Sequence, residues 1–189
     1  MENALIVSNT DKGSSSFAEL LNAASIKQIT ILASCAEARR FLLERDFDLV
    51  VVDSPLRDES GIDFAQRIAF EGVSQVILAV NNAHFDEVSA ICEECGVLTV
   101  SKPVSKAFFW YALKLAEAAG SRLKRIQDEN VRLKQKIEDI RIIDRAKLIL
   151  ISHLNMNEQE AHRYIEKQAM DMRTTRRAIA ERILRTYEV

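Results

Sequence analysis

The sequence is poor in the residues that interrupt regular structure. It contains two prolines and five glycines in 189 residues, and neither type occurs after Gly120. Proline and glycine are the residues that most disfavour the interior of a helix. The C-terminal third of the chain can therefore form long helices without a break.

Long apolar runs are also absent. No run approaches the roughly 18–20 apolar residues that cross a bilayer. The N-terminus, MENALIVSNTDKG, has neither the basic region nor the apolar region of a signal peptide. We therefore expect a cytoplasmic protein with no membrane partner.

Cysteine is scarce, and its number is odd. Three cysteines (Cys35, Cys92 and Cys95) argue against a disulfide framework. Cys92 and Cys95 have the spacing of half a zinc site, but no second cysteine or histidine pair completes it. We expect no metal site at these thiols. The chain as a whole is expected to have no metal ligands, no cofactor and no catalytic residues, and not to be an enzyme.

The net charge is small but unevenly distributed. Residues 1–110 hold 9 Lys+Arg against 16 Asp+Glu, whereas residues 111–189 hold 17 against 12. A basic C-terminal part beside an acidic N-terminal part suggests that the C-terminal part meets an anionic partner.

The first part of the chain alternates short apolar runs with stretches of helical periodicity. The predicted strands are residues 4–8, 29–33, 48–53, 76–80 and 98–100. Each is followed by a predicted helix, near residues 14–21, 36–46, 62–71, 84–96 and from about 105 onward. Alternation of this kind is typical of a parallel sheet covered on both faces, which is a doubly wound α/β domain.

A heptad pattern follows over residues 116–143. Two series of positions seven residues apart begin at Ala116 and Ala119, and an Asn130 on the first series is typical of parallel two-stranded pairing. The pattern favours a coiled-coil homodimer over a helix packed on its own domain. The predicted dimer contacts are Leu123, Ile126, Asn130, Leu133, Ile137 and Ile140.

The last segment, residues 144–189, is predicted to be a small bundle of three helices, the first continuous with the coiled coil. Asn157 and Glu160 resemble a capping box at the start of the second helix, and Thr174-Thr175 signal the start of the third. The expected apolar faces are Ala161, Tyr164, Ile165, Gln168, Ala169 and Met172, and Ile179, Ala180, Ile183, Leu184 and Tyr187.

Residues 1–115 resemble the receiver domain of two-component response regulators, which has a flavodoxin-like fold. Asp53 ends the third predicted strand and Lys102-Pro103 follow the fifth. DSPLRDESGIDF (53–64) is similar to the family's loop that begins at this aspartate, although its proline falls early. The resemblance implies that Asp53 is the phosphoacceptor, that Lys102 assists it, and that a sensor kinase or another signalling protein is a partner.

Four positions depart from the receiver pattern. Ser8 and Asn9 stand where the family has the acidic residues that hold Mg²⁺, and Val80 and Thr99 replace its hydroxyl and aromatic residues. Phosphoryl transfer to a carboxylate needs the metal to neutralise developing charge. We expect a degenerate receiver in which Asp53 pairs with Lys102 and Mg²⁺ is not held. The alternative is inefficient phosphorylation of Asp53 with a distorted Mg²⁺ site.

Residues 146–184 resemble the ANTAR domain, an RNA-binding antiterminator module. The matching positions are Ala146, Lys147, Leu150, Glu158, Ala161, Ala169, Met170, Arg173 and Ala180, while Leu148 departs from the glycine of many members. The resemblance implies a dimer that binds nascent-RNA hairpins and prevents termination of transcription.

Basic residues of this segment are the candidates for contacting RNA phosphates and bases. They are Lys147, Arg163, Lys167, Arg173, Arg176 and Arg177. Two alternatives stay open. The last two helices could form a DNA-binding helix-turn-helix, although no longer basic recognition helix follows the arginines. The chain could also be a protein-interaction module that binds no nucleic acid.

Overall fold

A computed structural model describes residues 1–72 and 74–187 of the chain. The chain divides into two compact units, Met1–Lys124 and Arg125–Val189. The division falls inside the segment predicted as a coiled coil, and the three-part division of the sequence stays a prediction. No described helix is long and apolar enough to cross a membrane.

The first unit is built on a five-stranded parallel sheet, ordered β2-β1-β3-β4-β5. The strands are β1 (Asn3–Val7), β2 (Gln28–Leu32), β3 (Leu49–Asp53), β4 (Gln75–Asn81) and β5 (Leu98–Lys102). All five predicted strands are present, and the predicted doubly wound α/β fold is confirmed.

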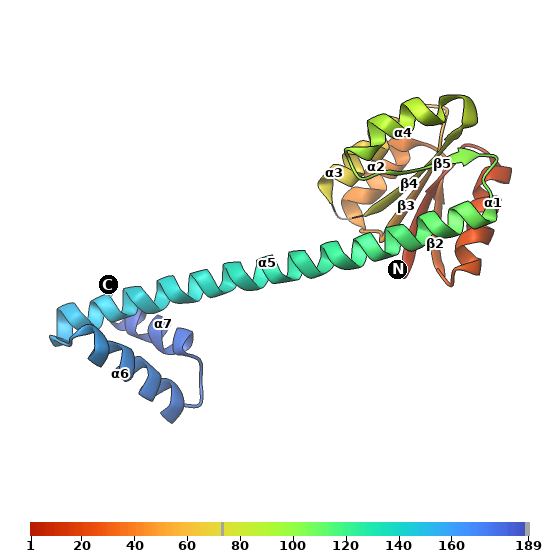
Figure 1. Ribbon diagram of the computed structural model, residues 1–189. Coiled ribbons are helices and arrows are strands. Elements are labelled where there is room, and N and C mark those ends of the chain that lie inside the picture. Colours follow the sequence, from red (N-terminus) through yellow and green to blue (C-terminus); the bar gives the residue numbers. More distant parts are fainter. Residues whose placement is uncertain (73, 188–189) are drawn as a thin grey trace. The chain divides into compact units, whose positions relative to one another are not determined.

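Helices cover both faces of this sheet (Figure 1). They are α1 (Asp11–Ala23), α2 (Cys35–Glu44), α3 (Ile62–Glu71), α4 (Phe85–Glu93), which follows the 3₁₀ turn η1 (Asn82–His84), and α5 (Lys106–Leu154). One apolar core joins α2, α3 and α4 to the sheet, and the other joins α1 and α5 to its opposite face.

The central strands are apolar on both sides because both faces of the sheet are covered. In β3, Val50 and Val52 pack into the core beneath α2, α3 and α4, while Leu49 and Val51 pack beneath α1 and α5. Side chains of a strand point alternately to opposite faces, and every residue of β3 is buried. The continuous apolar run therefore places Asp53, its last residue, at the carboxyl edge of the sheet.

The helix α5 is longer than a single domain requires, with 49 residues. The predicted heptad residues Ile126, Leu133, Ile137 and Ile140 are 44–59% exposed. Ala116 is different, because it is fully buried in the core of its own sheet domain. Ala116 therefore cannot take part in contacts between two helices of a dimer. The sevenfold spacing of the sequence does not distinguish an alanine buried in its own domain from one in a dimer contact.

The second unit contains the end of α5, α6 (Glu158–Asp171) and α7 (Arg176–Tyr187). The predicted capping box is confirmed: the Asn157 side chain accepts from the Glu160 N–H, and the Glu160 carboxylate accepts from the Asn157 N–H, both at 2.9 Å. The Thr175 hydroxyl accepts from the Ala178 N–H at the start of α7, as its sequence signal predicted. The bundle core contains Ala146, Leu150, Ala161, Ile165, Ala169, Ile179, Ala180, Ile183 and Leu184.

The buried stripe of α6 is narrower than predicted. Tyr164 is 38% exposed, Met172 is 49% exposed, and Tyr187 at the end of α7 is 37% exposed, so the expectation that they fill the core was wrong. The buried residues of α6 are Ala161, Ile165 and Ala169, spaced four apart. Small alanines let neighbouring helices approach closely, which leaves the large side chains beside the stripe at the surface.

Candidate nucleic-acid interface and receiver pocket

Asp53 lies in a polar cluster at the carboxyl edge of the sheet and is only 7% exposed. Lys102 Nζ donates to Asp53 Oδ1 at 2.9 Å, and Ser8 Oγ donates to Asp53 Oδ2 at 2.8 Å. Lys102 also donates to the carbonyl of Ser54. Both carboxylate oxygens are therefore engaged by the chain itself, and the sequence-predicted pair of Asp53 and Lys102 is brought together.

The first turn of α1 closes over the same carboxylate. A Cβ atom at Gly13 would lie 2.3 Å from Asp53 Oδ2 and 2.6 Å from Ser8 Oγ. Real Cβ atoms do not approach oxygen so closely, so only glycine fits there. The Thr10 hydroxyl caps this turn by accepting from the Gly13 N–H at 3.1 Å. The sequence prediction missed Gly13, although a glycine in the first turn of a helix is a signal for close approach.

These residues do not fit a Mg²⁺ site of the receiver kind. Mg²⁺ prefers carboxylate oxygens in near-octahedral geometry. Here Ser8 and Asn9 offer neutral groups. Ser8 donates its hydroxyl proton toward Asp53, and the Asn9 amide donates to the Pro55 carbonyl. Val80, where the family has a hydroxyl residue, is buried in an apolar core.

A second polar cluster, formed by Cys35, Asp58 and Glu59, could bring three ligand atoms together. Its groups already have partners. Asp58 accepts from the N–H groups of Cys35 and Ala36 at the start of α2, and Glu59 pairs with Arg39 at 2.6 Å. Burial raises the pKa of the Cys35 thiol, so the thiolate that would bind a metal is disfavoured. This cluster fastens the β3–α3 loop to α2.

In the second unit, Arg173 has an unusual backbone conformation. Its φ is +50°, in the left-handed region where glycine is favoured. The Thr174 N–H donates to the Ala169 carbonyl and the Arg173 N–H to the Met170 carbonyl, at 2.9 and 3.1 Å. These bonds form a Schellman motif that ends α6. Arg173 occupies the position that is usually glycine, and its side chain is exposed.

A surface depression of about 520 Å³ lies beside Arg173. Met170 contributes an apolar side chain that is 72% exposed. Arg176 Nη1 lies 3.2 Å from Glu166 Oε1 on the same wall. The depression is lined by Glu166, Ala169, Met170, Arg173, Thr174 and Arg176.

Two of the six predicted RNA-binding residues, Lys147 and Arg177, are each held by two carboxylates. Lys147 Nζ lies 2.7 Å from Asp144 Oδ1 and 3.4 Å from Glu158 Oε1, and its side chain is only 16% exposed. The hydrogen bond that Lys147 donates to Asp144 raises the pKa of Lys147. This lysine fastens the end of α5 to the start of α6.

Arg177 is held in the same way. Its guanidinium lies 2.7 Å from Asp139 Oδ1 on α5 and 2.8 Å from Glu181 Oε1 on α7. The hydrogen bond from Arg177 holds the pKa of Asp139 below its usual value. Arg177 therefore ties α7 to α5.

The other basic residues face solvent with fewer partners. Within residues 1–72 and 74–187, the side chains of Arg163, Lys167 and Arg173 make no ion pair, and Arg176 pairs with the half-exposed Glu166 alone. Arg163, Lys167 and Met170 are four and three positions apart on α6, so they share its exposed face. We call Arg163, Lys167, Met170, Arg173 and Arg176 the α6–α7 surface.

Comparison with known proteins connects this surface to a family. Residues 131–184 match the ANTAR domain family. The chain is also 28% identical over 139 residues to the transcriptional regulatory protein PdtaR of Mycobacterium tuberculosis, covering 74% of this chain and 68% of that protein. The C-terminal part of the chain therefore resembles an ANTAR domain, and 74% of the chain is similar to a transcriptional regulatory protein.

Solved structures support the receiver fold of the first unit. The signal receiver domain of an HD domain-containing protein from Pseudomonas fluorescens Pf-5 superposes with a TM-score of 0.57 and 18% identity, covering 65% of this chain and 91% of that one. A CheY-like receiver domain from Methylobacillus flagellatus gives 0.53 and 22%, covering 61% and 98%. At these identities the likeness shows the fold alone.

Most ANTAR-matching positions lie in the core of the domain. Ala146, Leu150, Ala161, Ala169 and Ala180 are all buried in the bundle. Met170 and Arg173 are the matching positions with exposed side chains and no structural ion pair among the described residues. Packing therefore does not account for these two residues.

Proposed function

We propose that this response regulator binds RNA hairpins as a dimer through the α6–α7 surface of its ANTAR domain and acts as a transcription antiterminator in the cytoplasm. The observation that carries the proposal is Arg173. It combines a left-handed backbone with an unpaired, exposed guanidinium on the wall of a depression. Residues held in unfavourable conformations cluster at binding sites, where the surrounding structure maintains them.

The chemistry of the α6–α7 surface suits an RNA loop. Single-stranded loops expose unstacked bases together with phosphates. Met170 supplies an apolar side chain for a base, and Arg173 can stack its guanidinium plane or bind a phosphate with two hydrogen bonds. Arg163 and Lys167, one turn apart on α6, extend the positive charge along the same face. A dimer would present two such surfaces, which raises avidity for paired hairpins.

The proposed dimer uses the exposed heptad residues of α5. Ile126, Leu133, Ile137 and Ile140 leave apolar area in water that a second α5 would cover. The Asn130 amide donates to the Ile126 carbonyl of its own helix at 3.1 Å and is exposed, so its other donor is available for a partner asparagine.

We assign the receiver domain a role without phosphorylation. Lys102, Ser8 and the first turn of α1 engage or cover the Asp53 carboxylate, so the attacking oxygen that accepts a phosphoryl group is already occupied. The input would then come from a sensor kinase or another signalling protein that contacts the surface of the domain.

RNA binding is tested by fluorescence anisotropy with hairpins selected from a random pool. Arg173→Ala is expected to weaken binding about tenfold or more, corresponding to roughly 1.4 kcal/mol. Arg185→Ala is the matched control, because Arg185 is also an exposed arginine without an ion pair among the described residues. Equal affinity in both variants would contradict the site. Tighter binding to a DNA duplex than to any hairpin would favour a DNA-binding regulator, and no binding to either would favour a protein-interaction module.

Phosphorylation is tested separately with acetyl phosphate and Mg²⁺, followed by intact-mass measurement. We expect no adduct. A mass increase of one phosphate group that disappears in Asp53→Asn would show that the receiver is active and would overturn this part of the proposal.

A further inference from the structure

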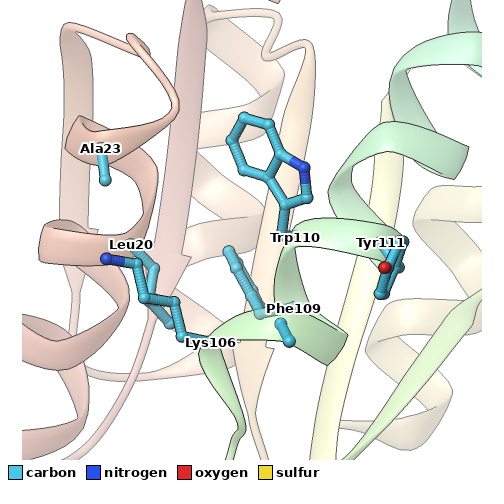
Figure 2. Close-up of a pocket in the computed structure, with 7 residues that line it drawn as sticks. Leu20, Ala23, Lys106, Phe109, Trp110 and Tyr111 are labelled. Atoms are coloured by element: carbon cyan, nitrogen blue, oxygen red, sulfur yellow. The ribbon is translucent and has the colours of Figure 1, made fainter.

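A cavity of about 380 Å³ lies between α1 and the first turns of α5 (Figure 2). Cavities that bind small molecules in proteins usually have volumes of roughly 300–1,000 Å³. The cavity is lined by residues of the first unit only, which are Leu20, Ala23, Lys106, Ala107, Phe109, Trp110 and Tyr111. It therefore has room for a small organic molecule within one compact part of the chain.

The cavity is separate from the core of the domain. Phe109 reaches into that core, where its ring centroid lies 5.7 Å from the ring centroid of Phe17. Ala23 and Ala107 are exposed, and their single methyl groups leave the space between the larger side chains unfilled. The core is thus complete without the cavity, and packing within the domain does not close it.

Aromatic side chains border the cavity. Phe109 is buried, whereas Trp110 is 43% exposed and Tyr111 is 66% exposed. Figure 2 shows the rings of Trp110 and Tyr111 leaving α5 in different directions, so they stand at different sides of the opening. Aromatic rings pack favourably on one another, either stacked or edge to face. These side chains therefore favour a ligand that contains a planar apolar ring.

The charge at the cavity is positive. Lys106 is the charged residue of the lining, and no described residue of the lining is acidic. In the part of the chain that the structure describes, the Lys106 ammonium group makes no ion pair. The nearby Lys114 lies 4.9 Å from the ring centroid of Trp110, but it pairs with Glu117 at 2.8 Å. An anionic group on the ligand would therefore find its partner in Lys106.

We propose that this cavity binds a small molecule that combines a planar apolar ring with a carboxylate group. The ring packs against Trp110 and Tyr111, and the carboxylate accepts from the Lys106 ammonium. A lysine can lay its apolar stem along an apolar wall while its charge stays at the edge of the water, so one side chain meets both parts of such a ligand. Figure 2 shows the Lys106 side chain extending from the start of α5 toward α1.

The proposed site is distinct from the receiver pocket. Gly13, whose turn covers Asp53, lies in the first turn of α1, whereas Ala23 is the last residue of that helix. A ligand beside Ala23 would give the receiver domain an input that does not involve the Asp53 carboxylate, in addition to the signalling protein proposed above.

NMR titration of the full chain with cinnamate tests the proposal. Cinnamamide has the same ring system without the charge and is the matched probe. Trp110 is the single tryptophan of the chain, so its indole N–H gives one signal that reports on this cavity. We expect cinnamate to shift that signal with a dissociation constant on the order of 1 mM or tighter, and cinnamamide to bind several-fold more weakly, by roughly the contribution of one ion pair.

Two variants test the two parts of the site. Ala23→Phe fills the cavity and should weaken cinnamate binding about tenfold or more. Its control is Ala36→Phe, because Ala36 is an exposed alanine of α2, which covers the opposite face of the sheet. Lys106→Met keeps an apolar stem without the charge, so it should weaken cinnamate roughly threefold to tenfold and leave cinnamamide unchanged. Lys12→Met, at the other end of α1, controls for the loss of one positive charge.

Four results would overturn the proposal. The first is that neither probe binds the native chain. The second is that cinnamate binds folded Ala23→Phe as tightly as the native chain, since the probe would then lie elsewhere on the apolar surface. The third is equal binding of the two probes, unchanged in Lys106→Met, which would remove the role of the carboxylate.

The fourth result concerns a second copy of the chain as the occupant. If the Trp110 signal moved with chain concentration and cinnamate bound only the dilute chain, a second copy would cover the cavity in place of a ligand. None of these measurements uses RNA, so their outcome is independent of whether the α6–α7 surface binds a hairpin.

Discussion

The receiver pocket and the ANTAR domain both carry charged residues at family positions, but the two regions use them differently. In the pocket, the buried Asp53 and the partly exposed Lys102 bind each other. In the ANTAR domain, Lys147 and Arg177 are tied to carboxylates, whereas Arg173 projects unpaired into solvent. A family motif therefore marks a position, and the ion pairs at that position indicate whether its charge holds the fold or is available to a ligand.

The largest expected effect concerns the pair of Asp53 and Lys102. Asp53→Ala would leave Lys102 without its carboxylate partner. Removing one member of a buried pair costs about 3–5 kcal/mol. Because the Lys102 side chain is 25% exposed, water can partly replace the lost partner, and we expect a loss of about 2–4 kcal/mol. Urea unfolding measures it.

The double variant Asp53→Ala with Lys102→Ala supplies the control for this prediction. It should recover part of the stability lost in the single variant, because no uncompensated charge remains. If the losses in the free energy of unfolding were strictly additive, the two residues would not stabilise one another. The charges of the receiver pocket would then not hold the fold as those of Lys147 and Arg177 do.

Two glycines within helices, Gly13 and Gly120, differ in how closely their surroundings are packed. Gly13→Ala would push a Cβ to within 2.3 Å of Asp53 Oδ2. We expect a loss of about 1–3 kcal/mol, as in overpacked cores. In Gly120→Ala, the new Cβ meets only the flexible side chain of Gln75 at 3.1 Å, so the higher helix propensity of alanine should prevail and add up to about 1 kcal/mol. Thermal unfolding of both variants checks the contrast in sign.

Much of the fold could be predicted from local patterns. The continuous apolar run of β3 specified a buried parallel strand ending in Asp53, and Asn157 with Glu160 specified where α6 starts. These signals depend on neighbours in the sequence. They therefore determine which segments form strands and helices, and which residues lie at the ends of those segments.

The division of the basic residues could not be predicted in that way. Arg177 pairs with Asp139, 38 positions earlier in the chain. Which acid meets which base depends on how three helices pack, and one sequence contains no signal for that. The exposure of Tyr164 has the same origin, because the width of a buried stripe is set by the neighbouring helices.

Acid provides a test of the paired arginine. Arg177 lowers the pKa of Asp139, so this carboxylate stabilises the fold fully above its unfolded pKa of about 3.9 and loses that contribution as pH falls through the lower folded value. The stability difference between the native chain and Arg177→Ala should therefore shrink below about pH 4. The difference between the native chain and Arg173→Ala should stay small at every pH. Urea unfolding midpoints across the acid range measure both differences. If the midpoints of the two variants depended on pH in the same way, Arg177 could not be distinguished from Arg173 as the residue that stabilises the fold.

The smallest effect on stability is the most direct test of what Arg173 is for. Arg173→Gly places at the end of α6 the residue that its left-handed backbone favours, so the free energy of unfolding should rise by a few tenths to about 1 kcal/mol. The same change removes an unpaired charge from the α6–α7 surface, so RNA affinity should fall and its dependence on salt should weaken by about one phosphate contact. Greater stability with weaker binding means that the chain accepts backbone strain to display this guanidinium. If Arg173→Gly instead bound RNA as tightly as the native chain, Arg173 would only end α6, less favourably than glycine would. It would then have no role in RNA binding by the α6–α7 surface.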